Sequence, residues 1–458
     1  MSLVSPVGML PLLLLLLLPL VLAAPSSPAA FDHIAAGIPP SQDPFYNVPD
    51  GLENIRPGTI LKHRPPPRPM AAFGFAPINL KGEHQILYRT TDNFGAATAT
   101  VLTVLVPHHA DFTKLLSYQV AEDAALVDCA PSYAFQFDHA RGPGLGTIVT
   151  EAELLLIEGA LERGWVVIVP DFLGPRAAFL ANQQAGHATL DGIRAAMASG
   201  SFTGINARPT ISMWGYSGGS LATLWAAELQ PLYAPELQIA GAAAGGIVPN
   251  ITTVVHHANK KTDAGLIPAG ILGLGNAYPD LNKYIEQHLR PEFRQEFLKA
   301  RKQCLAGNIA QFAGRDIVAM FDDPNILWGP VSVNVSSQND LGRASPRIPL
   351  FIFKSVNDEI SPVAETDALV RDYCASGSSI EYQRDTASSH ASLPVLSAAK
   401  VLSWLIDTMD GANRNRGCTT RTVFSSLLDP ATLRVLPKFL LDAFLDLLGK
   451  PVGPPFVE

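Results

Sequence analysis

The stretch that most constrains the fold of this chain is Thr210–Glu228, with the sequence TISMWGYSGGSLATLWAAE. Its centre, Gly215–Gly219, is a G-x-S-x-G pentapeptide around Ser217. The residues before the pentapeptide are strand formers, whereas Ser220–Ala227 predicts a helix. A serine between a strand and a helix is typical of a nucleophile elbow, in which a strained turn exposes the hydroxyl beside the helix N-terminus. The alternative is a chance turn of glycine and serine, so the interpretation depends on finding partners for this serine.

Length and charge limit what surrounds this motif. With 458 residues, the chain is expected to form one large domain with an insertion, or two domains. Its 47% hydrophobic and 16% charged residues indicate a globular protein with a large core. The net charge of −8 argues against nucleic acid as a partner, because no basic surface is available to neutralise phosphates.

The N-terminal residues 1–24 have the features of a secretory signal peptide. An apolar core, Leu10–Leu22, is followed by the small residues Ala23 and Ala24. This core is short and interrupted by proline, so a retained membrane anchor is the weaker alternative. No later stretch is long and apolar enough to span a membrane. We therefore expect a secreted, extracellular protein without a transmembrane anchor.

Secretion leads us to expect disulfides and glycosylation. Four cysteines allow three pairings, and their spacing does not choose between them. Two N-glycosylation sequons begin at Asn250 and Asn334, which is consistent with the same compartment. The cysteines are Cys129, Cys304, Cys374 and Cys418.

Strand and helix patterns alternate over residues 25–249. Pro25–Met70 is rich in proline and is expected to be an irregular arm on the surface. His84–Thr91 and Ala97–Val106 then predict a hairpin. Continuous apolar strands alternate with helices after that point, which indicates an α/β sheet covered on both faces. The predicted elements are strand Lys114–Val120, helix Glu151–Arg163, strand Trp165–Val169, helix Ala188–Ser199 and strand Leu237–Ala244.

Residues 250–346 interrupt this alternation and predict an inserted, mainly helical cap. Pro291 is expected to divide Asp280–Ala300 into two helices, and Ile309–Phe321 is a further predicted helix. Gly270–Gly275 has the spacing G-x-x-G-x-G, which is the wrong order for a dinucleotide fingerprint, and we expect a flexible cap loop there.

The α/β pattern returns over residues 347–426, and residues 427–458 form a separate tail. The predicted elements of the returning part are strand Pro349–Ser355, helix Val363–Cys374, strand Ile380–Gln383 and helix Leu393–Met409. In the tail, Pro437–Leu448 predicts an amphipathic helix. Its apolar face contains Leu440, Phe444, Leu447 and Leu448, and its polar face Asp442 and Asp446. This helix is expected either to dock on the core or to form a C-terminal flap over a substrate entrance.

Two residues after the cap have the positions needed to activate Ser217. In an α/β-hydrolase the acid and then the histidine follow the serine along the chain, each in a loop after a late strand. Asp358 follows the strand at 349–355, with Glu359 as a competing neighbour, and His390 follows the strand at 380–383. His256 and His257 fall inside the cap and are expected at the surface.

An oxyanion hole would complete this constellation. Its first donor is expected to be the backbone N–H of Gly218, directly after the serine. A second could come from the loop at 117–123, where Asp123 is the candidate, although an ordinary surface loop explains this pattern equally well. No H-E-x-x-H, C-x-x-C or EF-hand pattern is present, so neither a metal nor another cofactor is expected.

Several motifs in matching order make the chain similar to the fungal secretory lipase family of the α/β-hydrolase superfamily. They are SYQVAEDAALVDCAPSYAF, DGIRAAM, GYSGGSLATLWAAELQPLYAPEL and NDEISP, followed by the late His390. The resemblance implies an α/β-hydrolase fold with a helical cap and a C-terminal flap. It implies a triad of Ser217, Asp358 and His390, oxyanion donors at Asp123 and Gly218, and disulfides Cys129–Cys304 and Cys374–Cys418.

The expected activity is hydrolysis of carboxylic esters, and triacylglycerols are the first expected substrates. The enzyme would meet such lipids at a lipid–water interface. Three alternatives remain open from the sequence. They are an esterase that deacylates a fungal secondary metabolite, a serine peptidase of the same fold, and a catalytically inactive binding protein.

Overall fold

The computed structural model describes residues 37–72, 76–137, 147–413 and 415–454. The chain divides into two units between Gly37 and Ile38, and the fold described below is that of the unit from Ile38 onward. The predicted signal peptide at 1–24 lies outside the described residues.

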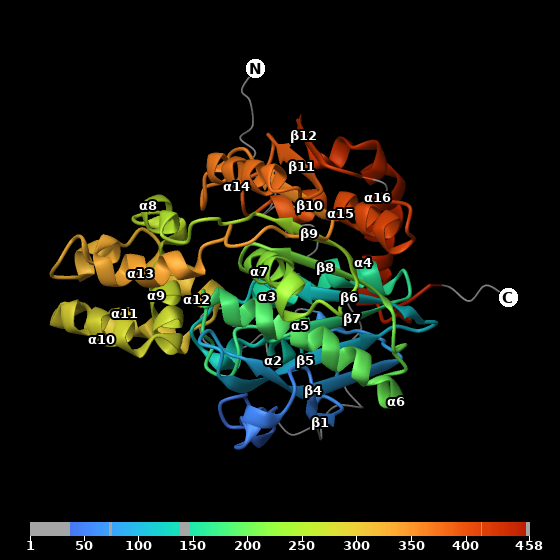
Figure 1. The fold of residues 1–458 in the computed structure, drawn as a ribbon, viewed down its shortest axis with the longest axis horizontal. Helices are drawn as coiled ribbons and strands as arrows, with labels where there is room; N and C mark the ends of the chain where they lie inside the picture. The colour runs from blue at the N-terminus through green and yellow to red at the C-terminus, as the bar shows by residue number, and fades with distance from the viewer. Residues whose placement is uncertain (1–36, 73–75, 138–146, 414, 455–458) are drawn as a thin grey trace. The chain divides into compact units, whose positions relative to one another are not determined.

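A mixed sheet of ten strands forms the centre of this unit, in the order β1-β4-β5-β7-β6-β8-β9-β10-β11-β12 (Figure 1). The strands from β6 to β12 are parallel to one another, whereas the pairs β1–β4, β4–β5 and β5–β7 are antiparallel. The predicted hairpin is β4–β5, with Thr91 opposite Ala97. The strands are β1 Ile60–Arg64, β4 Gly82–Thr91, β5 Ala97–Val106, β6 Asp111–Gln119, β7 Trp165–Pro170, β8 Thr210–Tyr216, β9 Ile239–Gly245, β10 Leu350–Ser355, β11 Ile380–Asp385 and β12 Cys418–Val423.

Helices cover both faces of the sheet, and successive strand residues contribute to two different cores. In β8, for example, Met213 belongs to one apolar cluster and Trp214 to the other. The first cluster includes side chains of α5 Asn182–Ala198, α7 Gly218–Tyr233 and α14 Val363–Ala375. The second includes side chains of α4 Leu154–Leu161, α15 Leu393–Met409 and α16 Pro430–Leu447. Because both faces are covered, the central strands are apolar on both sides, as the sequence predicted.

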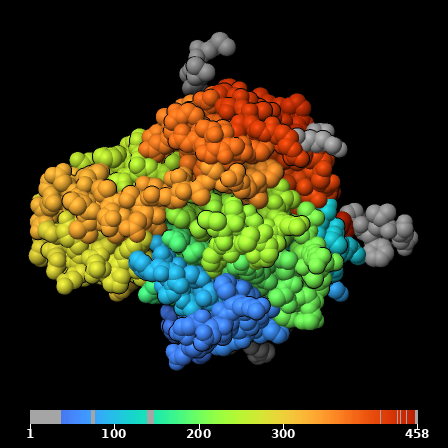
Figure 2. All heavy atoms as spheres, in the orientation of Figure 1, coloured from blue at the N-terminus to red at the C-terminus, as the bar shows by residue number. Residues whose placement is uncertain are grey.

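The regular elements between β9 and β10 are all helical among the described residues of that segment. Figure 2 shows its atoms, yellow-green to orange, gathered at the left of the view. The main helices are α8 Thr253–Ala258, α9 Leu266–Ala277, α10 Pro279–His288, α11 Pro291–Phe297, α12 Leu305–Phe312 and α13 Pro330–Asn339. Shorter elements elsewhere are β2 Ala71–Ala72, β3 Ala76–Pro77, α2 Pro131–Ala134, α3 Ile148–Ala152 and α6 Gly200–Thr203.

Two expectations for this segment were wrong. Gly270–Gly275 is not a flexible loop but lies inside α9. A Cβ atom at Gly273 would lie 2.5 Å from the Cβ of Phe179, so the missing side chains let the helix pack closely on a loop of the core. The helix expected at Ile309–Phe321 is α12, which ends at Phe312, and Gly314 beyond it has a positive φ of 72°.

The tail helix is oriented only partly as predicted: Leu447 packs on the core, but other residues of the predicted faces do not follow the pattern. Leu440 and Leu448, expected to face the core, are 56% and 59% exposed, whereas Asp446 is fully buried. On the inward side, Asp446 lies 3.2 Å from Lys450, which also pairs with Glu162 of the core at 2.9 Å. The face of α16 that packs on the core thus combines this polar cluster with the apolar side chains of Val435, Phe439 and Leu447.

Both edges of the sheet contain strands that the sequence did not predict. Strand β1 lies in the expected irregular arm, and β12 follows α15. Five of the six residues of β12 are exposed. Neither edge strand therefore shows the apolar pattern by which the central strands were identified.

Candidate active site

Ser217 occupies a sharp turn between β8 and α7. Its φ of 50° and ψ of −122° are strained for a residue with a side chain. The turn depends on two glycines, because a Cβ at Gly215 would lie 2.3 Å from the carbonyl oxygen of Gly219 and one at Gly219 would lie 2.0 Å from that of Gln119. The local geometry is therefore that of a nucleophile elbow.

Three side chains from different loops form one hydrogen-bonded chain. The Nε2 atom of His390 lies 2.8 Å from the Oγ of Ser217, and its Nδ1 lies 2.8 Å from the Oδ2 of Asp358. These residues follow β8, β10 and β11, so all three lie at the carboxyl edge of the parallel strands. Ser217 is half-buried, and the other two are each 9% exposed. The three residues that the sequence singled out thus lie together.

The carboxylate of Asp358 is held by four donors. Its Oδ1 accepts the backbone N–H groups of Ile360 and Ser361, each at 2.9 Å. Its Oδ2 faces His390 and the ammonium group of Lys354, which is 2.8 Å away. Burial alone would raise the pKa of Asp358, but His390 and Lys354 hold this pKa well below its usual range. Asp358 is therefore an ionised acceptor.

Glu359, the competing acid, contacts the backbone of the histidine loop instead of the imidazole. Its Oε2 accepts the N–H of His390 at 2.8 Å, and its Oε1 accepts that of Ala391 at 3.3 Å. The hydroxyl of Tyr216 donates to the carbonyl oxygen of His390 at 2.6 Å. Both backbone groups of His390 are thereby fixed. Sequence reasoning missed Tyr216, although its position next to Ser217 was a signal.

The two candidate oxyanion residues line the same pocket as Ser217. Gly218 is the first residue of α7, and Asp123 has a positive φ of 42°. The carboxyl group of Asp123 is buried, which raises its pKa to about 7. Its Oδ1 lies where a Cβ at Gly218 would be, 1.8 Å away, so the glycine makes room for this carboxyl group.

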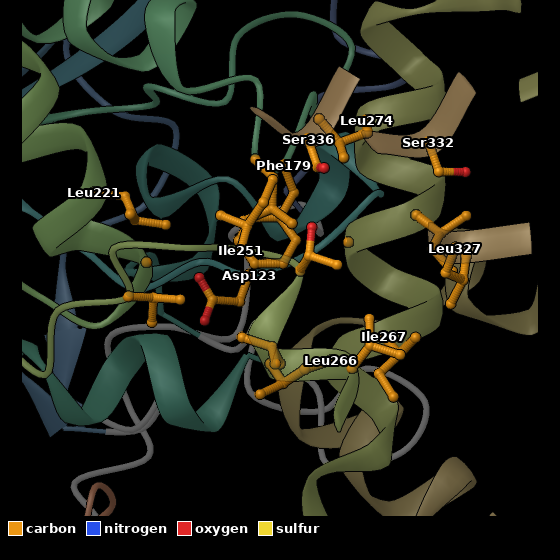
Figure 3. A pocket seen from close by; sticks show the side chains of 18 of the residues that line it. Asp123, Phe179, Leu221, Ile251, Leu266, Ile267, Leu274, Leu327, Ser332 and Ser336 are labelled. Carbon is orange, nitrogen blue, oxygen red and sulfur yellow. The ribbon is translucent and has the colours of Figure 1, made fainter. Parts of the chain in front are cut away.

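This pocket has a volume of about 100 Å³ and an almost wholly apolar wall (Figure 3). It runs from Ser217 and Asp123 between the core and the helices of the 250–346 segment. The hydroxyl groups of Ser332 and Ser336 are bonded to nearby backbone carbonyls. The apolar lining includes Phe179, Leu221, Ile251, Leu266, Ile267, Leu274 and Leu327. Such a wall suits a hydrocarbon chain better than a charged or peptide-like group.

The other predicted sites have simple surroundings. Cys129 is bonded to Cys304 and Cys374 to Cys418, which are the pairings that the resemblance implies. Asn250 and Asn334 are exposed, as glycosylation requires. His256 is exposed and stacks near Trp328.

Neither a metal centre nor a membrane-spanning helix is present among the described residues. No group of three or more histidine, cysteine, aspartate or glutamate side chains could hold a metal ion there. None of the helices in that part of the chain has the length and apolar content that crossing a membrane requires.

Comparison with known proteins gives consistent matches. A family model described as "Secretory lipase" matches residues 140–417. Lipase A of Arthroderma benhamiae is 49% identical over 422 residues, which are 92% of this chain and 90% of the relative. Lipase 2 of Candida albicans is 38% identical over 445 residues, covering 94% and 93% of the two chains.

Solved structures agree with these matches. Lipase A of Candida antarctica in its closed state superposes with a TM-score of 0.79 at 28% identity, covering 93% of this chain and all of the other. The rice cell wall degrading esterase LipA from Xanthomonas oryzae matches with a TM-score of 0.59 at 14% identity, covering 78% and 100% of the two chains. The second match supports the α/β-hydrolase fold alone.

Proposed function

The chain belongs to the secretory lipase family, and we propose that it is a secreted serine hydrolase of carboxylic esters, acting chiefly on triacylglycerols. One observation carries the proposal: the hydrogen-bonded chain from Ser217 through His390 to Asp358 opens directly into an apolar pocket. The names of the relatives support the same activity. The ester would come from lipid outside the cell.

The first half-reaction transfers the acyl group to the enzyme. The Oγ of Ser217 attacks the ester carbonyl carbon while the Nε2 of His390 takes the hydroxyl proton. Asp358 accepts the Nδ1–H of His390 and stabilises the imidazolium that forms. The backbone N–H groups of Gly218 and Asp123 would bind the oxyanion. As the C–O bond to the alcohol breaks, His390 returns the proton to the leaving oxygen.

The second half-reaction releases the acid. A water molecule gives its proton to His390 and attacks the acyl-enzyme carbonyl, and the bond to Ser217 Oγ breaks as the histidine protonates this oxygen. The products are an alcohol and a carboxylic acid, and the enzyme is restored. No cofactor takes part in these steps.

The surrounding segments have proposed roles that follow from their contacts. Residues 250–346 would act as a helical cap, because Val255, Ile271 and Ile285 of this segment line the pocket. For residues 427–458, the packing of α16 on α4 and α15 supports a docked helix rather than a flap. Asn250 and Asn334 would be glycosylated during secretion.

The decisive test is Ser217→Ala. We expect the hydrolysis of short-chain p-nitrophenyl esters to fall by about 10⁶-fold, since loss of a serine nucleophile has this effect in a related triad. A fluorophosphonate probe should label the native protein and not the variant. Retained hydrolysis in the variant would refute the proposal, and an unlabelled native protein would indicate an inactive binding protein.

A panel of esters from acetate to oleate, tested below and above the solubility limit, defines the substrate. The apolar pocket predicts that longer acyl chains react faster. A preference for an acetylated small molecule over emulsified triolein would indicate an esterase of secondary metabolites. Faster cleavage of peptide amides than of esters would indicate a peptidase.

A further inference from the structure

A lysine is fully buried directly behind the candidate triad. Lys354 is the fifth residue of β10, and its side chain has no exposed surface. Lysine side chains are almost never fully buried unless they are paired. Here the ammonium group donates to the carbonyl oxygen of Ile247 at 2.8 Å and pairs with Asp358 at 2.8 Å. The lysine therefore bridges the ends of two adjacent strands.

Lys354 and His390 share one oxygen of Asp358. Both donors lie 2.8 Å from its Oδ2, whereas Oδ1 is occupied by the two backbone N–H groups. An ionised carboxylate has about four acceptor positions, so these four donors saturate it and fix its orientation. In addition, the positive charge of Lys354 offsets part of the negative charge that Asp358 presents to His390.

We propose that Lys354 is a positioning residue of the triad, which holds Asp358 ionised and oriented and extends the activity to lower pH. This inference rests on the proposed function of the triad. A carboxylate partly neutralised by a neighbouring cation stabilises the imidazolium less than a free carboxylate does. Removal of Lys354 would therefore strengthen the attraction between Asp358 and the imidazolium form of His390.

Other charged groups face the same two side chains. Asp358, Glu359 and Glu365 act on Lys354. Asp123 and Asp263 act on His390 in addition to Asp358. Burial lowers the pKa of Lys354, whereas the carboxylates of Asp358, Glu359 and Glu365 oppose that effect. Because all of these acids remain in a variant of Lys354, a comparison with the native protein isolates the effect of the lysine.

The test is the pH dependence of kcat/KM for a soluble ester in Lys354→Met and Lys354→Gln. We expect the acid limb of the profile to move upward by about one pH unit in both variants, because each removes a unit charge close to Asp358. At the alkaline plateau of the profile, kcat/KM should fall less than tenfold. A purely structural lysine would lower kcat/KM by the same factor at every pH.

Lys400→Met is the matched control. Lys400 is also buried and pairs with Glu381 at 3.2 Å, but neither residue contacts the triad. Its replacement should leave the acid limb unmoved. The rate of fluorophosphonate labelling across the same pH range provides a second readout that counts only folded sites.

The outcomes separate this inference from the proposed function. If fluorophosphonate labels the native protein at Ser217 but neither Lys354 variant moves the acid limb, the inference is wrong and the proposed function stands. If Lys354→Met fails to fold, Lys354→Gln decides alone, because glutamine can still donate to Ile247. A profile restored by glutamine would show that hydrogen bonding, and not charge, is the contribution of Lys354, and would overturn the pH argument.

Discussion

At the scale of single residues, two adjacent carboxylates have different tasks because the backbone turns between them. Asp358 points into the chain of hydrogen bonds and accepts the Nδ1–H of His390. Glu359 accepts the backbone N–H of the same histidine. Asp358 would therefore stabilise the charged imidazole, whereas Glu359 would hold the backbone of His390 in position.

Substitution of each acid by its amide should separate these tasks. Asp358→Asn should lower kcat by about 10⁴-fold, because an amide NH2 group in place of Oδ2 donates to Nδ1 of His390 and favours the wrong tautomer. Glu359→Gln keeps an acceptor for the backbone N–H, so we expect a loss of about tenfold or less, equivalent to about 1.4 kcal/mol. Steady-state kinetics with a soluble ester measure both. A larger loss in Glu359→Gln than in Asp358→Asn would assign the acid to Glu359.

The sequence located Ser217, Asp358 and His390 because chain order and strand ends constrain them. It could not show that Lys354 contacts Asp358 or that Tyr216 contacts His390. Both residues lie inside apolar strands, where their polar atoms appear as interruptions of a core pattern. Their partners, Asp358 and the carbonyl of His390, come from loops whose positions only the folded chain defines.

At the scale of elements, α9 shows that a glycine-rich stretch can form either a loop or a closely packed helix. Glycines in a row of apolar residues predicted a loop, since glycine weakens helices by about 1 kcal/mol. In the structure the helix is stabilised by tertiary contact, and Gly273 lies directly against the backbone of Phe179. The same pattern therefore describes a helix that must approach its neighbour closely.

Gly273→Ala should destabilise the protein. The added Cβ would lie 2.5 Å from the Cβ and 2.7 Å from the carbonyl oxygen of Phe179, and backbone cannot easily move away. We expect a loss of about 1–3 kcal/mol in the free energy of unfolding, measured by chemical denaturation.

Gly275→Ala in the same helix is the matched control. Its Cβ would meet only the side chain of Asn282 at 3.1 Å, and the gain in helix propensity should offset this crowding. Equal effects of the two substitutions would show that helix propensity, and not the contact with Phe179, determines the result.

At the scale of the whole molecule, the covered parallel centre of the sheet was predictable and its edges were not. The strands from β6 to β10 lie under helices on both faces, and most of their buried residues are apolar. The strand β12, with the sequence CTTRTV, has only one neighbour and is exposed. For α16, periodicity predicted the helix, but it placed Asp446 on the polar face, whereas this residue is buried beside Lys450.

The burial of many carboxyl groups predicts how the stability of the whole molecule depends on pH. Burial raises the pKa of six of them to about 7 or 8, above ordinary values near 4. Such groups bind more protons in the folded than in the unfolded state over this interval, so their contribution to stability is complete below pH 4 and is lost as the pH rises through 7. The six carboxyl groups with raised pKa are those of Glu83, Asp123, Glu151, Glu153, Asp171 and Asp446.

Two histidines whose pKa burial lowers, His84 and His187, act in the opposite direction over a lower pH range. Burial lowers the pKa of His187 to about 4, so its contribution grows as the pH rises from about 4 to its ordinary value of 6.5. Six carboxyl groups against two imidazoles leave a net decrease of stability above about pH 4. We therefore expect Tm to be highest near pH 4 and to fall by several degrees by pH 8, in calorimetry at constant ionic strength.

Asp446→Asn tests the origin of this decrease. The amide resembles the protonated acid in shape and cannot lose a proton, so the variant should lose less stability than the native protein between pH 5 and 8. Because Asp446 also accepts from Lys450, the variant is compared by its slope with pH and not by its absolute Tm. A native Tm that is constant or rises from pH 5 to 8 would contradict the argument, since the six buried acids would then be ionised in the folded state without cost.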